Sequence, residues 1–197
     1  MNFNKSLRIT SYFEEAVYEI FPMQPIPVIP ENTESDFKAQ AWVLLNGRTW
    51  SEVIGLRLYD GGLNLHFIAW LRDLPLDVVR YYLPSHLIVA SILIYYNVES
   101  NHPIDLVEAL ILPPSKDEKL LADMDSELSL VSRLEYEWES RLDLYKIMNP
   151  KERACIAYFL DIYGEYKESE FTPPGFELFK KNTEYWRNSS LPCSVFD

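Results

Sequence analysis

WLRDLPLDVVRYYLPSHLIVASILIYYN, residues 70–97, is the stretch that decides the fold. From residue 83 to residue 96 it contains no ionised side chain, and its polar interruptions are two serines and His86. A run of this length falls short of the about 20 apolar residues that a membrane-spanning helix needs. It is long enough for a helix that is buried on most of its faces, and Pro84 suits the first turn of such a helix. We therefore predict a buried core helix that begins at Pro84, preceded by a separate helix that starts near Asp73 and ends there.

Length and composition indicate a folded chain with a sizeable core. The sequence has 197 residues, of which 48% are hydrophobic and 14% aromatic. A chain of this size buries roughly 70% of the surface that it exposes when unfolded. Such a composition argues against intrinsic disorder, and the length is typical of one domain with appendages.

The N-terminal part predicts a helix followed by an extended connector. Residues 7–21 follow the i, i+3, i+4 apolar spacing of an amphipathic helix, and the next residue is a proline that stops it. Residues 22–30, PMQPIPVIP, contain four prolines and no charge, which is typical of a polyproline-like segment. We expect Ile26, Val28 and Ile29 to pack this connector against the body of the protein.

Capping signals place the next two helices. Thr33 opens a helical pattern that Gly47 closes as a helix-ending glycine. Thr49 and Glu52 have the spacing of a capping box, in which each side chain bonds the backbone N–H of the other residue. We predict a short helix that starts immediately after Thr49.

Helical patterns also fill the second half of the chain. An acidic helical pattern runs from Ser115 to Ile147, with a break predicted near Asp125-Ser126. Asn149, a first-turn proline and Glu152 then stand in the preferred positions for a helix start, and Gly164 is predicted to end that helix. Residues 173–175, two prolines and a glycine, are predicted to form a loop before a last helix over 176–186.

These patterns predict a mainly α fold. We expect a single compact multi-helix domain over residues 33–190, with residues 1–32 forming the N-terminal helix and the proline-rich connector. Residues 63–67 alternate weakly between apolar and polar side chains, so at most a minor short strand pair is expected.

Four short motifs follow one another along the chain. They are Gly47-Arg48-Thr49-Trp50, then Tyr81-Tyr82-Leu83-Pro84, then Pro150-Lys151-Glu152-Arg153 followed by Phe159-Leu160, and finally Tyr185-Trp186. In their order and spacing they resemble a family of small, uncharacterised bacterial proteins, over most of the chain from about residue 38. The resemblance implies a helical domain of bacterial type. It implies no activity, ligand or catalytic residue.

The charge of the chain is strongly negative and unevenly distributed. The net charge is −12, and between Glu108 and Asp143 there are ten acidic and four basic residues. This sign disfavours nucleic acids and anionic membranes, so we expect neither as a partner. The acidic stretch is either a solvated helical face that aids solubility or a docking surface for a basic protein partner. The candidate binding residues of that surface are Asp123, Asp125, Glu127, Glu135, Glu137 and Glu139.

Cysteine usage and the N-terminus predict a cytoplasmic location. Cys155 and Cys193 form neither a disulfide framework nor a metal-binding knuckle, and Cys155 falls in an apolar helical pattern as a buried thiol. The first ten residues, MNFNKSLRIT, lack the apolar segment of a signal peptide.

The sequence lacks the motifs of the common catalytic, metal and nucleotide sites. The three histidines stand apart from one another and from metal-ligand spacings, and no nucleophile elbow or phosphate-binding glycine loop occurs. We therefore expect no metal, no cofactor and no catalytic residue. One alternative site stays open, a pocket that Arg48, Trp50, Tyr82 and His86 would form around the predicted break at Pro84.

Two functions follow from these observations. The first is a non-catalytic acidic binding protein, for example an immunity-type protein that masks a basic partner. The alternative is an enzyme or small-ligand binder whose site lies near Tyr82, His86 and Arg48. The sequence leaves the oligomeric state open.

Overall fold

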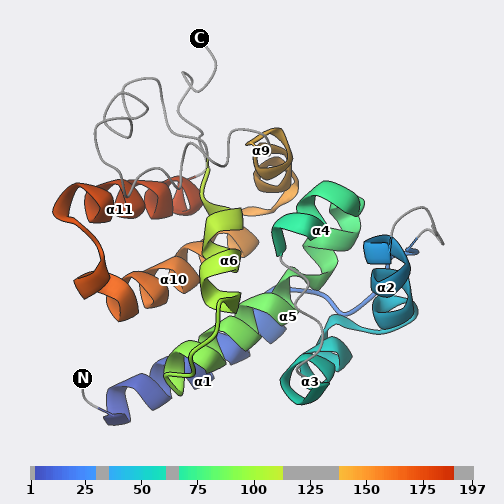
Figure 1. Ribbon diagram of the computed structural model, residues 1–197, viewed down its shortest axis with the longest axis horizontal. Helices are drawn as coiled ribbons and strands as arrows, with labels where there is room; N and C mark the ends of the chain where they lie inside the picture. The colour runs from blue at the N-terminus through green and yellow to red at the C-terminus, as the bar shows by residue number, and fades with distance from the viewer. Residues whose placement is uncertain (1–2, 30–35, 61–66, 113–137, 189–197) are drawn as a thin grey trace. The chain divides into compact units, whose positions relative to one another are not determined.

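The computed structural model describes residues 3–29, 36–60, 67–112 and 138–188 (Figure 1). Most of these residues are helical, and no strand occurs within the four ranges. The predicted mainly α fold is thereby confirmed. The weakly alternating stretch 63–67 falls outside the described residues except for Phe67, which begins a helix.

Contacts divide the chain into two compact units, Met1–Ala109 and Leu110–Asp197. The predicted division between residues 32 and 33 stays a prediction. The described helices of the first unit are α1 (Phe3–Ile20), α2 (Asp36–Leu45), α3 (Trp50–Asp60), α4 (Phe67–Asp73), α5 (Leu76–Tyr95) and α6 (His102–Leu110), whose last residue already belongs to the second unit. Those of the second unit are α9 (Trp138–Ile147), α10 (Pro150–Lys167), a 3-10 helix (Glu168–Glu170) and α11 (Pro173–Arg187).

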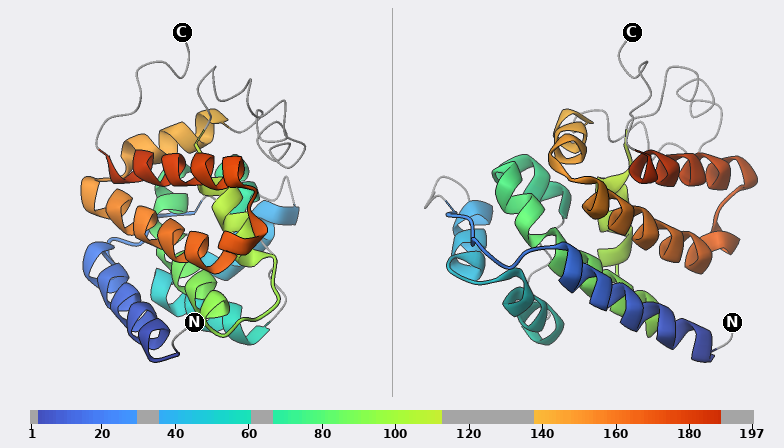
Figure 2. Two further views of the ribbon diagram at one scale, coloured as in Figure 1. Left: turned by 90° about the vertical axis from the view of Figure 1, so that its left-hand side faces the viewer. Right: turned by 180° about the vertical axis from the view of Figure 1, so that it is seen from behind.

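Helix α5 forms the centre of the first unit. It packs against α1, α3 and α4, and α1 lies alongside it (Figure 2, right). Its buried residues include Leu83, Leu87 and Ile88, none of which exposes any surface. By length and composition alone α5 could cross a membrane, a test that the buried core helix of a soluble protein also meets. Most of α5 is in fact buried inside the protein, which confirms the predicted core helix.

The predicted break at Pro84 is wrong, because Pro84 lies inside α5. The helix starts immediately after Pro75, where the prediction placed a start, and continues without interruption to Tyr95. An interior proline cannot donate to the carbonyl four residues earlier and costs about 3 kcal/mol in a helix. Each large apolar side chain that is fully buried contributes about 1.5–3 kcal/mol. The apolar side chains on both sides of Pro84 therefore offset this cost and keep the helix intact.

The predicted caps of α2 and α3 are confirmed. Gly47 has a φ of 72°, the left-handed conformation that ends a helix, and it follows the end of α2. At the start of α3 the backbone N–H of Thr49 donates to Glu52 Oε2 over 2.6 Å. The N–H of Glu52 donates in return to Thr49 Oγ1 over 3.4 Å, which completes the capping box. Thr33, the predicted start of α2, falls outside the described residues.

The connector after α1 contains neither helix nor strand over its described residues 22–29 and bends at Pro25, so its predicted polyproline-like conformation stays a prediction. Ile29 is buried and Ile26 is half-buried, which confirms that they pack the connector against the first unit. Val28 is 86% exposed, so the prediction for this residue is wrong. Of these two adjacent residues, only Ile29 faces the core.

In the second unit, α10 and α11 pack along each other (Figure 2, left). The predicted start of α10 is confirmed, because Asn149 Oδ1 accepts from the N–H of Glu152 over 3.0 Å and Glu152 Oε2 accepts from the N–H of Asn149 over 2.8 Å. The predicted end at Gly164 is wrong, since α10 continues to Lys167. Gly164 instead makes room for α11, because a Cβ at this position would lie 2.8 Å from Cε1 of the Phe179 ring.

The predicted loop over 173–175 is also wrong, because these residues form the first turn of α11. Thr172 is the N-cap, and its Oγ1 accepts from the N–H of Gly175 over 3.3 Å. Proline is tolerated in a first turn because its missing N–H has no intrahelical partner there. The pair of prolines therefore starts α11, where the sequence suggested an interruption.

Side chains of α11 fix the segment 110–112 of the second unit. The indole N–H of Trp186 donates to the Leu110 carbonyl over 2.7 Å. The amide of Asn182 accepts from the N–H of Leu112 over 3.2 Å and donates to the carbonyl of the same residue over 3.0 Å. All these groups are buried, so each bond satisfies a polar atom that would otherwise lose its contact with water.

Candidate functional site

The predicted acidic surface falls almost wholly outside the described residues. Asp123, Asp125, Glu127, Glu135 and Glu137 lie in the undescribed range 113–137. The sixth residue, Glu139, lies in the first turn of α9. The acidic surface therefore stays a prediction.

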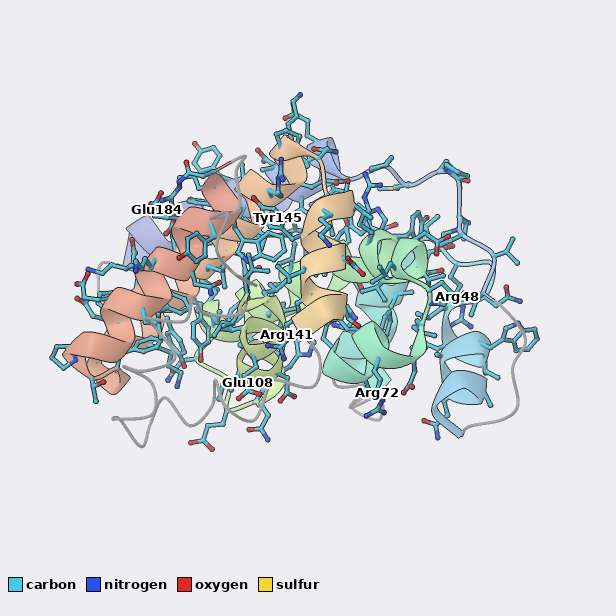
Figure 3. All side chains as sticks on the ribbon, turned by 90° about the horizontal axis from the view of Figure 1, so that it is seen from above. Arg48, Arg72, Glu108, Arg141, Tyr145 and Glu184 are labelled. Atoms are coloured by element: carbon cyan, nitrogen blue, oxygen red, sulfur yellow. The ribbon has the colours of Figure 1, made fainter. Side chains whose placement is uncertain are left out.

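The four residues of the alternative pocket lie in the first unit, where Tyr82 and Arg48 are direct neighbours. The hydroxyl of Tyr82 lies 2.7 Å from the carbonyl oxygen of Leu45 and 2.7 Å from that of Arg48. Nη1 of Arg48, which is labelled in Figure 3, donates to the carbonyl of Leu44 over 3.0 Å. Both side chains thus donate to carbonyls at the C-terminal end of α2, where the helix itself supplies no donors.

Trp50 and His86 contact different groups of residues. The indole N–H of Trp50 donates to the carbonyl of Pro22 over 3.3 Å, which fixes the start of the connector. His86 is joined to Tyr82 through Trp70, whose ring centroid lies 4.5 Å from that of His86 and 6.2 Å from that of Tyr82. Trp50, Tyr82 and His86 expose no surface.

Aromatic rings surround His86 on several sides. Phe67 of α4 approaches it edge-on at 4.6 Å between centroids, and the His102 ring stacks on it at 5.3 Å. Sequence reasoning did not find this contact, because the two histidines are far apart along the chain and the spacing of isolated histidines carries no signal. Within the described residues no group of three or more His, Cys, Asp or Glu side chains could hold a metal ion.

Burial controls the ionisation of the tyrosines in this region. It raises the pKa of Tyr82 well above the usual range for a phenol, and it also raises the pKa of Tyr81. Both hydroxyls therefore stay protonated at neutral pH and act as hydrogen-bond donors rather than as bases. The side chains of the predicted pocket make contacts of a structural kind, and a catalytic or ligand-binding role for them stays a prediction.

An exposed edge of the same region was not predicted. We define the connector surface as Tyr18 of α1, Met23 of the connector, Glu52 of α3 and Tyr81 of α5. The Tyr18 ring lies 4.8 Å from the Trp50 ring, and the Tyr81 hydroxyl donates to the carbonyl of Met23 over 2.5 Å. Tyr18 is 40% and Met23 is 38% exposed. The connector surface thus combines aromatic and apolar side chains that solvent can reach.

The charges of two carboxylates act on the tyrosines of the connector surface. Burial, and then the charge of Glu14, raises the pKa of Tyr18. The charge of Glu52 acts in the same direction on the pKa of Tyr81. Hydrogen bonds from Thr49 lower the pKa of Glu52 itself, so this carboxylate is ionised at neutral pH.

Cys155 is a buried thiol, as predicted. Burial, with a smaller contribution from the nearby charge of Glu152, raises its pKa to about 12. Since the thiolate is the nucleophilic form, Cys155 is inert near neutral pH. Cys193 falls outside the described residues.

No protein-family model, no curated protein and no solved structure matches the chain. The resemblance to a bacterial family therefore stays a prediction. Any function has to be argued from the charge, the burial and the contacts of this chain itself.

Proposed function

We propose that this chain is a non-catalytic acidic binding protein of the bacterial cytoplasm, whose partner is a basic protein. The observation that carries the proposal is the charge distribution. The net charge is −12, and half of it lies between Glu108 and Asp143. An immunity-type protein that masks a basic toxin domain is the most concrete form of this function.

Two features of the described residues support binding over catalysis. The hydroxyl of Tyr82, the guanidinium of Arg48 and the indole of Trp50 all donate to backbone carbonyls within the first unit. Groups used in this way hold the fold together. Cys155, in the second unit, is buried, and its thiol is protonated near neutral pH. It is therefore not available as a nucleophile.

Opposite charge has a specific kinetic consequence. A negative surface accelerates diffusional association with a basic partner, and salt screens this acceleration over a Debye length of about 8 Å at physiological ionic strength. We therefore expect the association rate to fall steeply as salt is added, while the dissociation rate changes less.

The experiment begins with affinity capture of the tagged chain from its native cells at low and high salt, followed by identification of a stoichiometric partner. Association rates are then measured for a variant that carries Asp123→Lys, Asp125→Lys and Glu127→Lys. Its matched control carries Glu165→Lys, Glu168→Lys and Glu177→Lys, which change the net charge equally at exposed positions of α10, the 3-10 helix and α11.

The first variant is expected to slow association at low salt by about tenfold or more, and the control by much less. Equal slowing of both variants would assign the effect to net charge and remove the acidic stretch as the binding surface. A partner that is not basic, or a rate that salt does not change, would overturn the proposed function.

A further inference from the structure

The connector surface joins three parts of the chain that are distant in sequence, namely residues 18–23, residues 50–52 and Tyr81. The Tyr18 ring contacts the Trp50 ring in a tilted arrangement, and the hydroxyl of Ser51 lies 3.8 Å from Sδ of Met23. The Tyr81 hydroxyl bonds the backbone of Met23 across 58 positions of the sequence. These contacts show that α1, the connector, α3 and α5 meet at one place in the first unit, and that their side chains there form one surface.

This surface is held in place before any partner arrives. Capping bonds fix Glu52, the contact with the Trp50 ring holds the Tyr18 ring, and the Tyr81 hydroxyl is anchored to the backbone. Side chains that are already ordered lose little conformational entropy on binding. Tyrosine and methionine are enriched in protein interfaces, and tyrosine is enriched among the residues that contribute most of the binding energy.

The charges beside the tyrosines select the kind of partner. Glu14 lies one helical turn before Tyr18 on α1, and Glu52 is held at the start of α3 by its bond from Thr49. Their charges act on the phenols of Tyr18 and Tyr81, respectively. A cation placed over a tyrosine ring gains about 0.5–1 kcal/mol at an exposed site, and a neighbouring carboxylate adds to this attraction. Arg48 is the basic residue whose charge acts on Glu52, and its Nη1 donates to the Leu44 carbonyl in α2.

We propose that the connector surface, Tyr18, Met23, Glu52 and Tyr81, is a docking site for a basic segment of the partner protein. Lysine or arginine side chains of that segment lie over the tyrosine rings, with their charges beside Glu14 and Glu52, and its apolar side chains contact Met23. This inference rests on the proposed function, because it gives the same basic partner a further contact surface, in the first unit and in addition to the acidic stretch.

The test uses peptides selected from a random phage-displayed library on the full chain. We expect the selected peptides to be rich in lysine and arginine. A synthetic copy of one such peptide is then titrated against a variant with Glu14→Gln and Glu52→Gln, in which glutamine keeps the capping geometry at position 52. The matched control, Glu15→Gln with Glu19→Gln, removes the same charge from exposed positions of α1.

We expect the Glu14→Gln, Glu52→Gln variant to bind the peptide about five- to tenfold more weakly, and the control less than about twofold more weakly. Met23→Ala is expected to weaken binding about three- to tenfold. Tyr12→Ala is expected to leave the affinity unchanged, because Tyr12 lies on α1 outside the connector surface and is already 63% exposed. Thermal unfolding of every variant distinguishes lost binding from lost folding.

The outcomes separate this proposal from the proposed function. Basic peptides that bind all variants equally would overturn the connector surface as the site and leave the basic partner standing. A selection without any excess of basic residues would count against both. If the chain self-associates and Met23→Ala abolishes that self-association, the surface would be assigned to a second copy of the chain, and the inference would be overturned.

Discussion

Tyr82 in the first unit and Tyr145 in the second perform the same task at the ends of two different helices. The Tyr82 hydroxyl lies 2.7 Å from the carbonyls of Leu45 and Arg48, at the end of α2. The Tyr145 hydroxyl, on α9 (Figure 3), lies 3.2 Å from the carbonyl of Tyr185 and 2.8 Å from that of Asn188, at the end of α11. The last carbonyls of a helix have no intrahelical donor, and a buried tyrosine supplies one in each unit.

The two sites differ in what else holds the helix end. After α2 the chain turns through Gly47 in the left-handed conformation, and Arg48 adds a second side-chain donor. After α11 the chain leaves in an extended conformation at Asn188, with φ −88° and ψ 145°. In the first unit, side chains thus fasten turns and the connector. In the second unit, two long helices pack closely along each other. The hydrogen bond from a tyrosine hydroxyl to a carbonyl at a helix end therefore occurs in two differently packed units.

The largest expected effect concerns the buried thiol of the second unit. With a pKa of about 12 against an ordinary value of about 9, Cys155 carries about a thousandfold less thiolate at pH 8 than an exposed cysteine does. Its alkylation by iodoacetamide should slow by a similar factor in the native protein and recover in urea. The measurement is made in a Cys193→Ser background, so that the signal comes from Cys155 alone. Rapid alkylation of the native protein would show that α10 opens far more easily than its burial implies.

The same thiol should make the second unit less stable at alkaline pH. Below about pH 9 it is protonated in both the folded and the unfolded chain, and its contribution to stability is complete. Between about pH 9 and the folded pKa of about 12, the unfolded chain releases the proton and the folded chain retains it, so stability falls as the pH rises. Burial raises the pKa of Tyr82 too, so the first unit should lose stability in the same direction.

A Gly→Ala substitution in each unit should change stability in opposite directions. Gly164→Ala places a Cβ 2.8 Å from the Phe179 ring, and overpacking of this kind costs about 1–3 kcal/mol. Gly55→Ala, inside α3, meets no atom within 4 Å and should gain up to about 1 kcal/mol from helix propensity. Urea unfolding measures both, and hydrogen exchange assigns each change to its unit. A gain in stability for both variants would mean that α10 and α11 adjust without strain. It would weaken the contrast between the two units.

Next in size are the two tyrosine hydroxyls. Tyr82→Phe removes a hydroxyl that lies 2.7 Å from the carbonyls of Leu45 and Arg48 and should lower the free energy of unfolding by about 1–2 kcal/mol, because the Leu45 carbonyl still accepts from the N–H of Arg48. Tyr145→Phe should cost about 1 kcal/mol, because its hydrogen bonds are only partly buried and water can replace the hydroxyl. Tyr12→Phe, on an exposed ring, is the control and should change nothing measurable. A larger loss for Tyr145 than for Tyr82 would reverse the order that burial predicts.

The sequence predicted those parts of the fold whose causes are local. The capping boxes at Thr49 and at Asn149 need only residues three positions apart, and both formed. Pro84 and Gly164 were misinterpreted because their local tendency to end a helix is overridden by contacts with distant residues. Burial of neighbouring side chains carries α5 through Pro84, and the approach of Phe179 explains the glycine within α10.

The candidate site shows the same limit. The Tyr82 hydroxyl lies beside the backbone carbonyl of Arg48, because the turn after α2 presents its carbonyls to α5, while the predicted pocket stays a prediction. The contacts of Tyr18 with Trp50 and of Tyr81 with Met23 join positions 32 and 58 apart, for which no periodicity in the sequence gives a signal. The exposed edge of the site could therefore be found only once the long-range packing was known.

The smallest expected effect tests the helix ends directly. Asn97 follows α5 with a φ of 51°, the N–H of Val98 donates to the carbonyl of Leu93 over 3.0 Å, and the N–H of Asn97 to that of Ile94 over 3.1 Å. This is a Schellman motif, in which glycine is the favoured left-handed residue. Asn97→Gly should therefore raise the free energy of unfolding by about 0.5 kcal/mol, as measured by urea unfolding.

The matched substitution at the end of α11, Asn188→Gly, should lower stability slightly. Asn188 is extended, so glycine there gains no conformational advantage and adds entropy to the unfolded chain. Equal effects at the two positions would show that the conformation of the residue after the helix does not distinguish the two units. Stability changes of opposite sign would show that a left-handed residue ends a helix in the first unit, whereas Tyr145 holds the end of α11 in the second unit.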